Sequence, residues 1–83
     1  MNLFFTESAR KDLDKSLPEI KQRILEKLSF FMAQNNPLSY AKAMVNNDFG
    51  QYRFRIGDYR AIFDVKKDQL VVLVIGHRKD IYN

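Results

Sequence analysis

The amino-acid sequence predicts an α+β fold of order β-α-α-β-β-β, with a helical hairpin packed on one face of a mainly antiparallel sheet. Two patterns lead to this prediction. In the first half of the chain, apolar residues recur every three or four positions, as in amphipathic helices. After residue 50 they gather in short runs separated by turn residues, as in strands. The 83 residues have room for one domain, spanning 1–83, and without cysteine no disulfide stabilises it.

The opening residues 2–5, NLFF, are expected to form a short strand. Thr6 follows as the expected N-cap of a helix over 7–16, because a threonine oxygen accepts a hydrogen bond from the first free N–H groups of a helix. Apolar residues spaced four apart give this helix one buried side: Ala9, Leu13 and Leu17.

A second helix is predicted over 17–34. Ser16 and Glu19 have the spacing of a capping box, and Pro18 lies where the first turn of a helix tolerates proline. One apolar stripe runs along the predicted helix: Ile20, Ile24, Leu25, Leu28, Phe31 and Met32. The Asn-Asn-Pro sequence at 35–37 ends it, so the two helices form a hairpin.

The segment 37–50 is predicted to be a helical turn, LSYAKAM, followed by a loop, NNDFG. Strands are predicted over 51–56, 59–66 and 69–75. The last of these is apolar on both faces, so we expect it inside the sheet.

The stretch YRFRIGDYRAIF at 52–63 predicts a β-hairpin that turns at Gly57-Asp58. Directly opposed residues share a face of a sheet, and successive residues alternate between faces. One face of this hairpin is therefore apolar: Tyr52, Phe54, Ile56, Tyr59, Ala61 and Phe63. The other face carries the arginines: Arg53, Arg55 and Arg60.

These arginines have two interpretations. One is a solvated outer face, with Arg60 paired to Asp58 or Asp64 in surface ion pairs. The other is a phosphate-binding surface on rigid strands, because the guanidinium fork suits phosphate oxygens. The second interpretation explains why like charges, which repel across a ladder, stand together.

A further hairpin, turning at Lys67-Asp68, is expected to extend the sheet with three pairs: Val65–Leu70, Ile62–Leu73 and Arg60–Ile75. The same alternation adds residues to the apolar face: Leu70, Val72 and Val74. The chain then leaves the sheet at Gly76, beside the Gly57-Asp58 turn. We expect its tail to bring three side chains to the rim of the arginines: His77, Arg78 and Tyr82. Arg78 has an alternative partner in Asp80.

The formal net charge of +4 is concentrated in the second half, where residues 50–83 hold seven basic side chains against four acidic ones. This excess is typical of proteins with a polyanionic partner. The longest apolar run, 70–75, is far shorter than the roughly 20 residues of a membrane span, and MNLFF does not resemble a signal peptide. The sequence therefore predicts a soluble, cytoplasmic protein without a membrane partner. With no acidic cluster or histidine pair, it predicts no metal or other cofactor.

The segments YRFRIGDYRAIFDV and LVVLVIGHRKDIY resemble the RelE/ParE superfamily of bacterial toxin–antitoxin modules, and the FTESARKDL helix start is similar to it as well. The resemblance covers nearly the whole chain except 37–50. It implies a ribosome-dependent endoribonuclease that cuts mRNA in the ribosomal A site and is held inactive by a cognate antitoxin. The family's functional positions fall on five residues: Arg53, Arg55, Arg60, Arg78 and Tyr82.

The ParE branch, which poisons DNA gyrase, generally lacks this full set, so the resemblance favours the nuclease branch. The implied reaction is attack of a ribose 2′-OH on the adjacent phosphodiester, with the four arginines neutralising the charge that develops on the phosphorane oxygens. The best-studied nucleases carry lysine where this chain has Arg53 and Arg55, and arginine holds its proton too tightly to act as a base.

Proton transfer needs another group, and His77 is the expected general base or acid because histidine titrates near neutrality. Tyr82 is the next choice, as a base, as a group that orients the ribose, or as a surface on which a base stacks. His77 has an alternative role in closing the strand end, and Tyr82 in packing on the sheet. Two other functions stay open: a ParE-like gyrase inhibitor, and a non-catalytic member that binds only its antitoxin and operator DNA.

Overall fold

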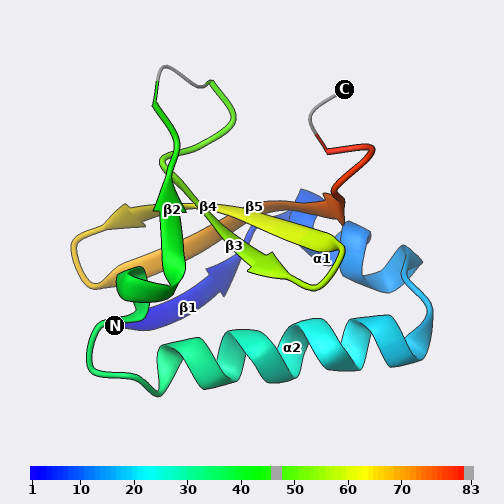
Figure 1. Cartoon of the computed structure of the whole chain (residues 1–83), viewed down its shortest axis with the longest axis horizontal. Helices are drawn as coiled ribbons and strands as arrows, with labels where there is room; N and C mark the ends of the chain where they lie inside the picture. The colour runs from blue at the N-terminus through cyan, green and yellow to red at the C-terminus, as the bar shows by residue number, and fades with distance from the viewer. Residues whose placement is uncertain (46–47, 82–83) are drawn as a thin grey trace.

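The sheet and the two helices form two layers, with both helices on one side of the sheet (Figure 1). The computed structural model describes residues 1–45 and 48–81. The elements in these ranges are β1 (Asn2–Phe5), α1 (Glu7–Lys15), α2 (Pro18–Met32), the 3₁₀ helix η1 (Pro37–Tyr40), β2 (Ala41–Ala43), β3 (Tyr52–Ile56), β4 (Tyr59–Lys66) and β5 (Gln69–His77). The predicted α+β class and the helical hairpin are confirmed.

The described strands form one five-stranded sheet in the order β1-β5-β4-β3-β2. β1 pairs with β5 in parallel, and each of the other neighbouring pairs is antiparallel. As predicted, β5 lies inside the sheet, between β1 and β4. The sheet is thus mainly antiparallel with one parallel strand at its edge.

The strand β2 was not predicted. The expected helical turn in LSYAKAM stops at Tyr40, and the next three residues, Ala41–Ala43, pair with β3 instead. Asn36 caps the 3₁₀ turn by accepting a hydrogen bond from the N–H of Leu38 at 3.2 Å. Alanine and lysine have low strand propensity, so the local sequence gives no sign of this strand, and pairing with β3 decides it.

The predicted N-cap of α1 is confirmed, since the hydroxyl oxygen of Thr6 accepts a hydrogen bond from the N–H of Ala9 at 3.1 Å. The predicted capping box of α2 is wrong. Ser16 instead ends α1, and its hydroxyl donates to the carbonyl of Asp12 at 3.0 Å. The N-cap of α2 is Leu17, which makes no side-chain capping bond, and Pro18 sets the first turn.

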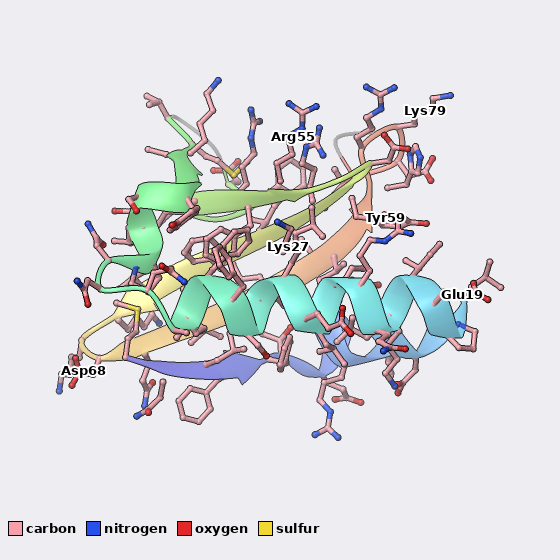
Figure 2. The ribbon with its side chains drawn as sticks, turned by 60° about the horizontal axis from the view of Figure 1, so that its bottom comes forward. Glu19, Lys27, Arg55, Tyr59, Asp68 and Lys79 are labelled. Atoms are coloured by element: carbon pink, nitrogen blue, oxygen red, sulfur yellow. The ribbon has the colours of Figure 1, made fainter. Side chains whose placement is uncertain are left out.

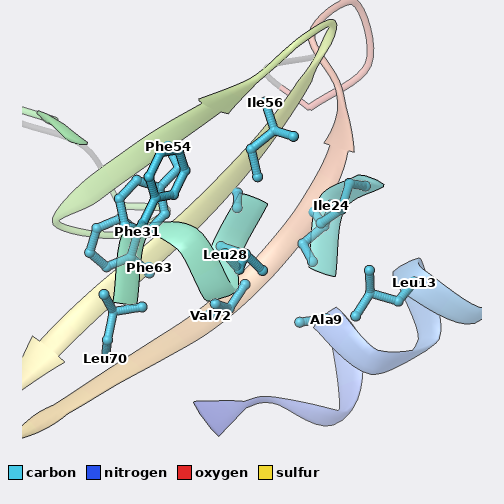
Figure 3. Packing of buried hydrophobic residues seen from close by; sticks show 12 residues of the cluster. Ala9, Leu13, Ile24, Leu28, Phe31, Phe54, Ile56, Phe63, Leu70 and Val72 are labelled. Carbon is cyan, nitrogen blue, oxygen red and sulfur yellow. The ribbon is translucent and has the colours of Figure 1, made fainter. Parts of the chain in front are cut away.

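The hydrophobic core lies between α2 and the sheet (Figure 3). From the predicted stripe of α2, Ile24, Leu28 and Phe31 are buried, while Ile20, Leu25 and Met32 are partly buried against the same core. Aromatic rings continue this contact into the sheet. Phe31 stacks on Phe54 with ring centroids 4.5 Å apart, and Phe54 stacks on Phe63 at 4.4 Å.

The register of the β3–β4 hairpin is the predicted one at all five pairs, from Tyr52 opposite Phe63 to Ile56 opposite Tyr59. Gly57 makes the turn possible, because its φ of +59° is a left-handed conformation that residues with a Cβ rarely adopt.

The predicted register of the β4–β5 hairpin is right from Val65–Leu70 to Phe63–Val72, and it is wrong at the predicted pairs Ile62–Leu73 and Arg60–Ile75. Between Ile62 and Phe63 the register shifts by one residue, because Leu73 is the extra residue of a β-bulge. Ile62 therefore lies opposite Val74, and Arg60 opposite Gly76. The bulge also exchanges the two faces of the strand, so that Ile75, 5% exposed, enters the core in place of the predicted Val74.

Candidate functional site

Arg53, Arg55 and Arg60 project from the side of the sheet opposite the helices, and we call this surface the arginine face. Arg55 lies directly opposite Arg60 on the neighbouring strand, and Arg53 lies two residues before Arg55 on the same strand. Alternation along β3 gives all three residues one face, while Phe54 between them is fully buried on the other. Figure 2 shows Arg55 on the side of the sheet away from α2.

Strand β2 adds a fourth cation that the sequence analysis missed. Lys42 is exposed and lies directly opposite Arg53, so it shares the arginine face. Lys42 and the three arginines line a groove of about 320 Å³, whose other wall is formed by residues 39–41. The signal that could have found Lys42 is the pairing of β2 with β3, which depends on the fold and not on the local sequence.

The guanidinium of Arg60 is held in place by the hairpin turn. Its Nη1 donates hydrogen bonds to the carbonyl of Gly57 at 2.9 Å and to its neighbour's carbonyl, that of Tyr59, at 2.8 Å. Neither Asp58 nor Asp64 forms an ion pair with Arg60 among the described residues. Arg60 therefore keeps its positive charge on the arginine face in a fixed orientation, with no carboxylate to neutralise it.

Arg78 reaches the rim of the arginine face at the same turn. Its backbone N–H donates to the carbonyl of Asp58 at 2.7 Å, which continues the pairing of β4 and β5 by one more residue pair. Its Nε lies 3.8 Å from a carboxylate oxygen of Asp58, an ion pair across the turn, and the alternative pair with Asp80 is not found among the described residues. Both side chains of this pair are more than half exposed, and an ion pair so exposed contributes little to stability.

His77 lies on the other side of the sheet. It pairs with Tyr59, whose ring packs against the core, and the two rings meet edge to face with centroids 5.4 Å apart. Figure 2 shows Tyr59 on the side of the sheet that faces α2. The imidazole Nδ1 accepts a hydrogen bond from the N–H of Lys79 at 3.1 Å, and the groove beside the ring includes Asp12 of α1.

The expected meeting of His77 with the arginines is therefore not found. The bulge at Leu73 is the physical reason, because one extra residue exchanges the faces of every residue after it. The remaining predicted site residue, Tyr82, lies outside the described residues.

Two other features of the described residues concern the predicted chemistry and location. In residues 1–45 and 48–81, no three His, Asp or Glu side chains are grouped so that they could hold a metal ion. Across the same part of the chain, no helix has both the length and the apolar composition needed to cross a membrane.

Comparison with known proteins places this fold in the class of toxins of type II toxin–antitoxin modules. Residues 3–82 match the family model described as the ParE toxin of the type II toxin–antitoxin system parDE. Because the match spans nearly the whole chain, the protein belongs to this family, within the RelE/ParE superfamily.

Similar proteins that are named as Rel toxins or Rel toxin–antitoxin complexes support the same superfamily. Toxin RelG of Mycobacterium tuberculosis is 32% identical over 80 residues, which cover 94% of this chain and 91% of that protein. In the crystal structure of the toxin–antitoxin complex RelBE2 from Mycobacterium tuberculosis, one chain is similar with a TM-score of 0.77 and 29% identity, covering 93% of this chain and 96% of that one. In the RelB–RelE antitoxin–toxin complex from Methanococcus jannaschii, the TM-score is 0.73 and the identity 26%, covering 95% and 94%.

Proposed function

We propose that this toxin is a ribosome-dependent endoribonuclease that cleaves mRNA and is held inactive by a cognate antitoxin. The observation that carries the proposal is the register of β3 and β4, which gathers Arg53, Arg55 and Arg60 on one face. The similar chains of known structure come from toxin–antitoxin complexes, which supports an antitoxin as the inhibitory partner.

In this proposal the arginine face binds the phosphodiester that is cut. A ribose 2′-OH attacks the adjacent phosphorus, the bond to the 5′ oxygen of the next nucleotide breaks, and the products are a 2′,3′-cyclic phosphate and a 5′-OH end. Negative charge grows on the phosphorane oxygens as the bond forms, and donors already fixed in place stabilise that charge best. Arg60, held by two carbonyls, is the cation that best meets this requirement. Arg53, Arg55 and Lys42 supply further charge along the groove.

Arg78 completes the set at the end of the groove nearest the turn. Its ion pair with Asp58 is exposed and weak, so a substrate phosphate competes with the carboxylate for the guanidinium. The role that we propose for Arg78 is to contact the phosphate or the leaving group after Asp58 has been displaced.

Proton transfer requires a different group, because the pKa of arginine lies far above neutrality. His77 is on the helix side of the sheet and its Nδ1 is occupied, so we expect His77→Gln to leave most of the cleavage activity in place. Tyr82, which corresponds to the closing tyrosine of the family, then remains as the next candidate for proton transfer, beside its alternative roles of orienting the ribose or stacking on a base. Replacing it by phenylalanine tests that role, because this change removes only the hydroxyl.

The proposal is tested in a translating cell extract with RNA sequencing that detects 2′,3′-cyclic phosphate ends. Arg60→Ala and Arg55→Ala should each reduce cleavage at least tenfold, the scale of losing one charged contact to the reacting phosphate. The matched control is Arg23→Ala, which removes an exposed arginine from α2, far from the arginine face. Undiminished cleavage in Arg60→Ala would show that the arginine face is not the active site.

A second candidate function follows from the family match, since the matched model is that of ParE. The ParE-like alternative is a poison of DNA gyrase that uses the same scaffold without cutting RNA. Inhibition of gyrase supercoiling by the purified toxin, with no new mRNA ends in the extract, would favour it. Absence of growth arrest on induction, together with tight antitoxin binding, would indicate a member that has lost toxicity.

A further inference from the structure

Strand β5 is longer than its neighbour β1, and beyond the end of β1 the helix α1 lies along the free edge of β5. β1 pairs with β5 only as far as Phe5 opposite Val72, whereas β5 continues to His77. Beyond Val72, the edge of β5 that faces away from β4 meets α1 and its N-cap residue. The backbone groups on this edge therefore need partners from the side chains of α1.

Thr6 donates hydrogen bonds to two successive backbone carbonyls of β5. Its backbone N–H donates to the carbonyl of Val72 at 2.9 Å, and its hydroxyl donates to the carbonyl of Leu73, also at 2.9 Å. In a regular strand, successive carbonyls point to opposite edges. Two successive carbonyls on one edge are possible here because Leu73 is the extra residue of the bulge.

Asp12 makes the third contact on this edge. Its carboxylate Oδ2 accepts a hydrogen bond from the N–H of Ile75 at 2.9 Å. If β5 were regular, the N–H of Ile75 and the carbonyl of Leu73 would both point toward β4 instead. In a chain that contains Leu73, the hydrogen bond from the Thr6 hydroxyl and the hydrogen bond to the Asp12 carboxylate can therefore both form only when the strand is bulged.

The bulge decides which residue joins the arginine face. With the bulge, His77 lies opposite Tyr59 on the helix side, and Arg78 follows opposite Asp58 on the arginine side. A regular strand would shift each residue by one position, so that His77 would lie opposite Asp58 and Arg78 would move away from the arginines.

We propose that Thr6 and Asp12 are positioning residues, which hold the β5 bulge and thereby place Arg78, and not His77, on the arginine face. Neither residue lines the groove of the arginine face, and both act on Arg78 through the register of the strand. The register is a property of the folded chain alone. Its consequence for RNA cleavage rests on the proposed function.

The single histidine of the chain makes the register measurable, because one imidazole gives one set of NMR signals. In the native protein a nuclear Overhauser effect should connect the rings of His77 and Tyr59, which lie 5.4 Å apart. In the double variant Thr6→Asp/Asp12→Ala, this signal should disappear. The aspartate keeps an acceptor for the N-cap of α1 but cannot donate to Leu73, and the net charge of the protein is unchanged.

The same variant is then titrated with inorganic tripolyphosphate as a probe of the arginine face. Its affinity should fall to that of Arg78→Ala, roughly tenfold below the native protein, as expected for the loss of one charged hydrogen-bonding partner. Thr6→Ser/Asp12→Asn keeps a hydroxyl that donates and accepts at position 6 and an oxygen acceptor at position 12, so this matched control should retain both the ring signal and the affinity.

A variant that lacks Leu73 tests whether the substitutions at Thr6 and Asp12 act through the bulge. Without the extra residue the strand is regular, yet every later residue keeps the face that the bulge gave it. In that background Thr6→Asp/Asp12→Ala should no longer affect the ring signal. Loss of the signal there would overturn the proposal, because the substitutions would then act by some route other than the bulge.

The proposal is also overturned if the folded double variant keeps the His77–Tyr59 signal and the native tripolyphosphate affinity. If the double variant does not fold, Asp12→Ala alone is measured, and it should show a weakened ring signal with reduced affinity. The mRNA cleavage assay is run in parallel. A native toxin that cuts no mRNA refutes the proposed function, whereas the ring signal and the tripolyphosphate titration still decide the role of Thr6 and Asp12.

Discussion

The arginine face should cost the protein stability, and Arg55→Gln should recover part of it. Arg55 lies directly opposite Arg60, which the turn carbonyls prevent from swinging away. Side chains that oppose each other across a ladder start about 5 Å apart. Two unit charges at about that distance in water repel by about 0.8 kcal/mol, in agreement with the range for like charges across strands. Removing the charge of Arg55 should therefore raise the free energy of unfolding by about 0.5–1 kcal/mol.

The assay is urea unfolding of native and Arg55→Gln protein at low salt and at about 1 M salt, where the screening length falls to about 3 Å. The gain should be present at low salt and nearly absent at high salt. Arg23→Gln, which removes an exposed arginine from α2, is the control and should change little at either salt concentration. If Arg55→Gln lowers stability, or if its effect is the same at both salt concentrations, the repulsion inferred from the register is absent.

Three further predictions concern the turn, the core and the helical hairpin. Gly57→Ala should lower the free energy of unfolding by about 1 kcal/mol in urea unfolding. The cost is that of the backbone alone, because φ is +59° and no atom lies within 4 Å of the added Cβ. Gly57→Asn should show a smaller loss, because asparagine tolerates this conformation better. Phe54→Ala should cost about 3–5 kcal/mol in the same assay, since its ring is fully buried between two others, and a loss below about 1.5 kcal/mol would contradict that packing. The hydrogen bond from Lys21 holds the pKa of Asp14 below its ordinary 3.8. The Asp14 carboxylate therefore adds stability above pH 3.8, and this stability is lost as the pH falls through the lower folded pKa. In Lys21→Met, NMR titration should show that the pKa of Asp14 returns toward 3.8.

The cost of the arginine face also bears on the proposed function. A cluster of like charges that weakens the fold persists when the charges are needed for binding, as strained or repulsive features at functional sites generally do. Arg55→Gln should therefore separate the two properties, with higher stability and lower RNA cleavage in one variant. A variant that gains stability and keeps full cleavage would leave the arginine face without a function in this reaction.

The sequence alone determined the helical hairpin and the β3–β4 register. The stripe of α2 repeats at the helical period, so its buried side can be read directly from the residues, and Ile24, Leu28 and Phe31 are indeed in the core. A two-residue turn at Gly57-Asp58 fixes every pair of the hairpin, so counting outward from it was enough to place the arginines together. Both predictions succeeded because the interactions that decide them lie within a few residues along the chain.

Tertiary structure alone decided strand β2, the bulge in β5, and hence the faces of His77 and Arg78. The residues of β2 have no strand preference of their own, and Lys42 joins the arginines only because β3 is there to pair with. At the bulge, the hydroxyl of Thr6 donates a hydrogen bond to the carbonyl of Leu73, a residue 67 positions away along the chain. No pattern in the sequence near Leu73 reports a partner so distant, because a bulge adds one residue without changing the apolar character of the strand around it.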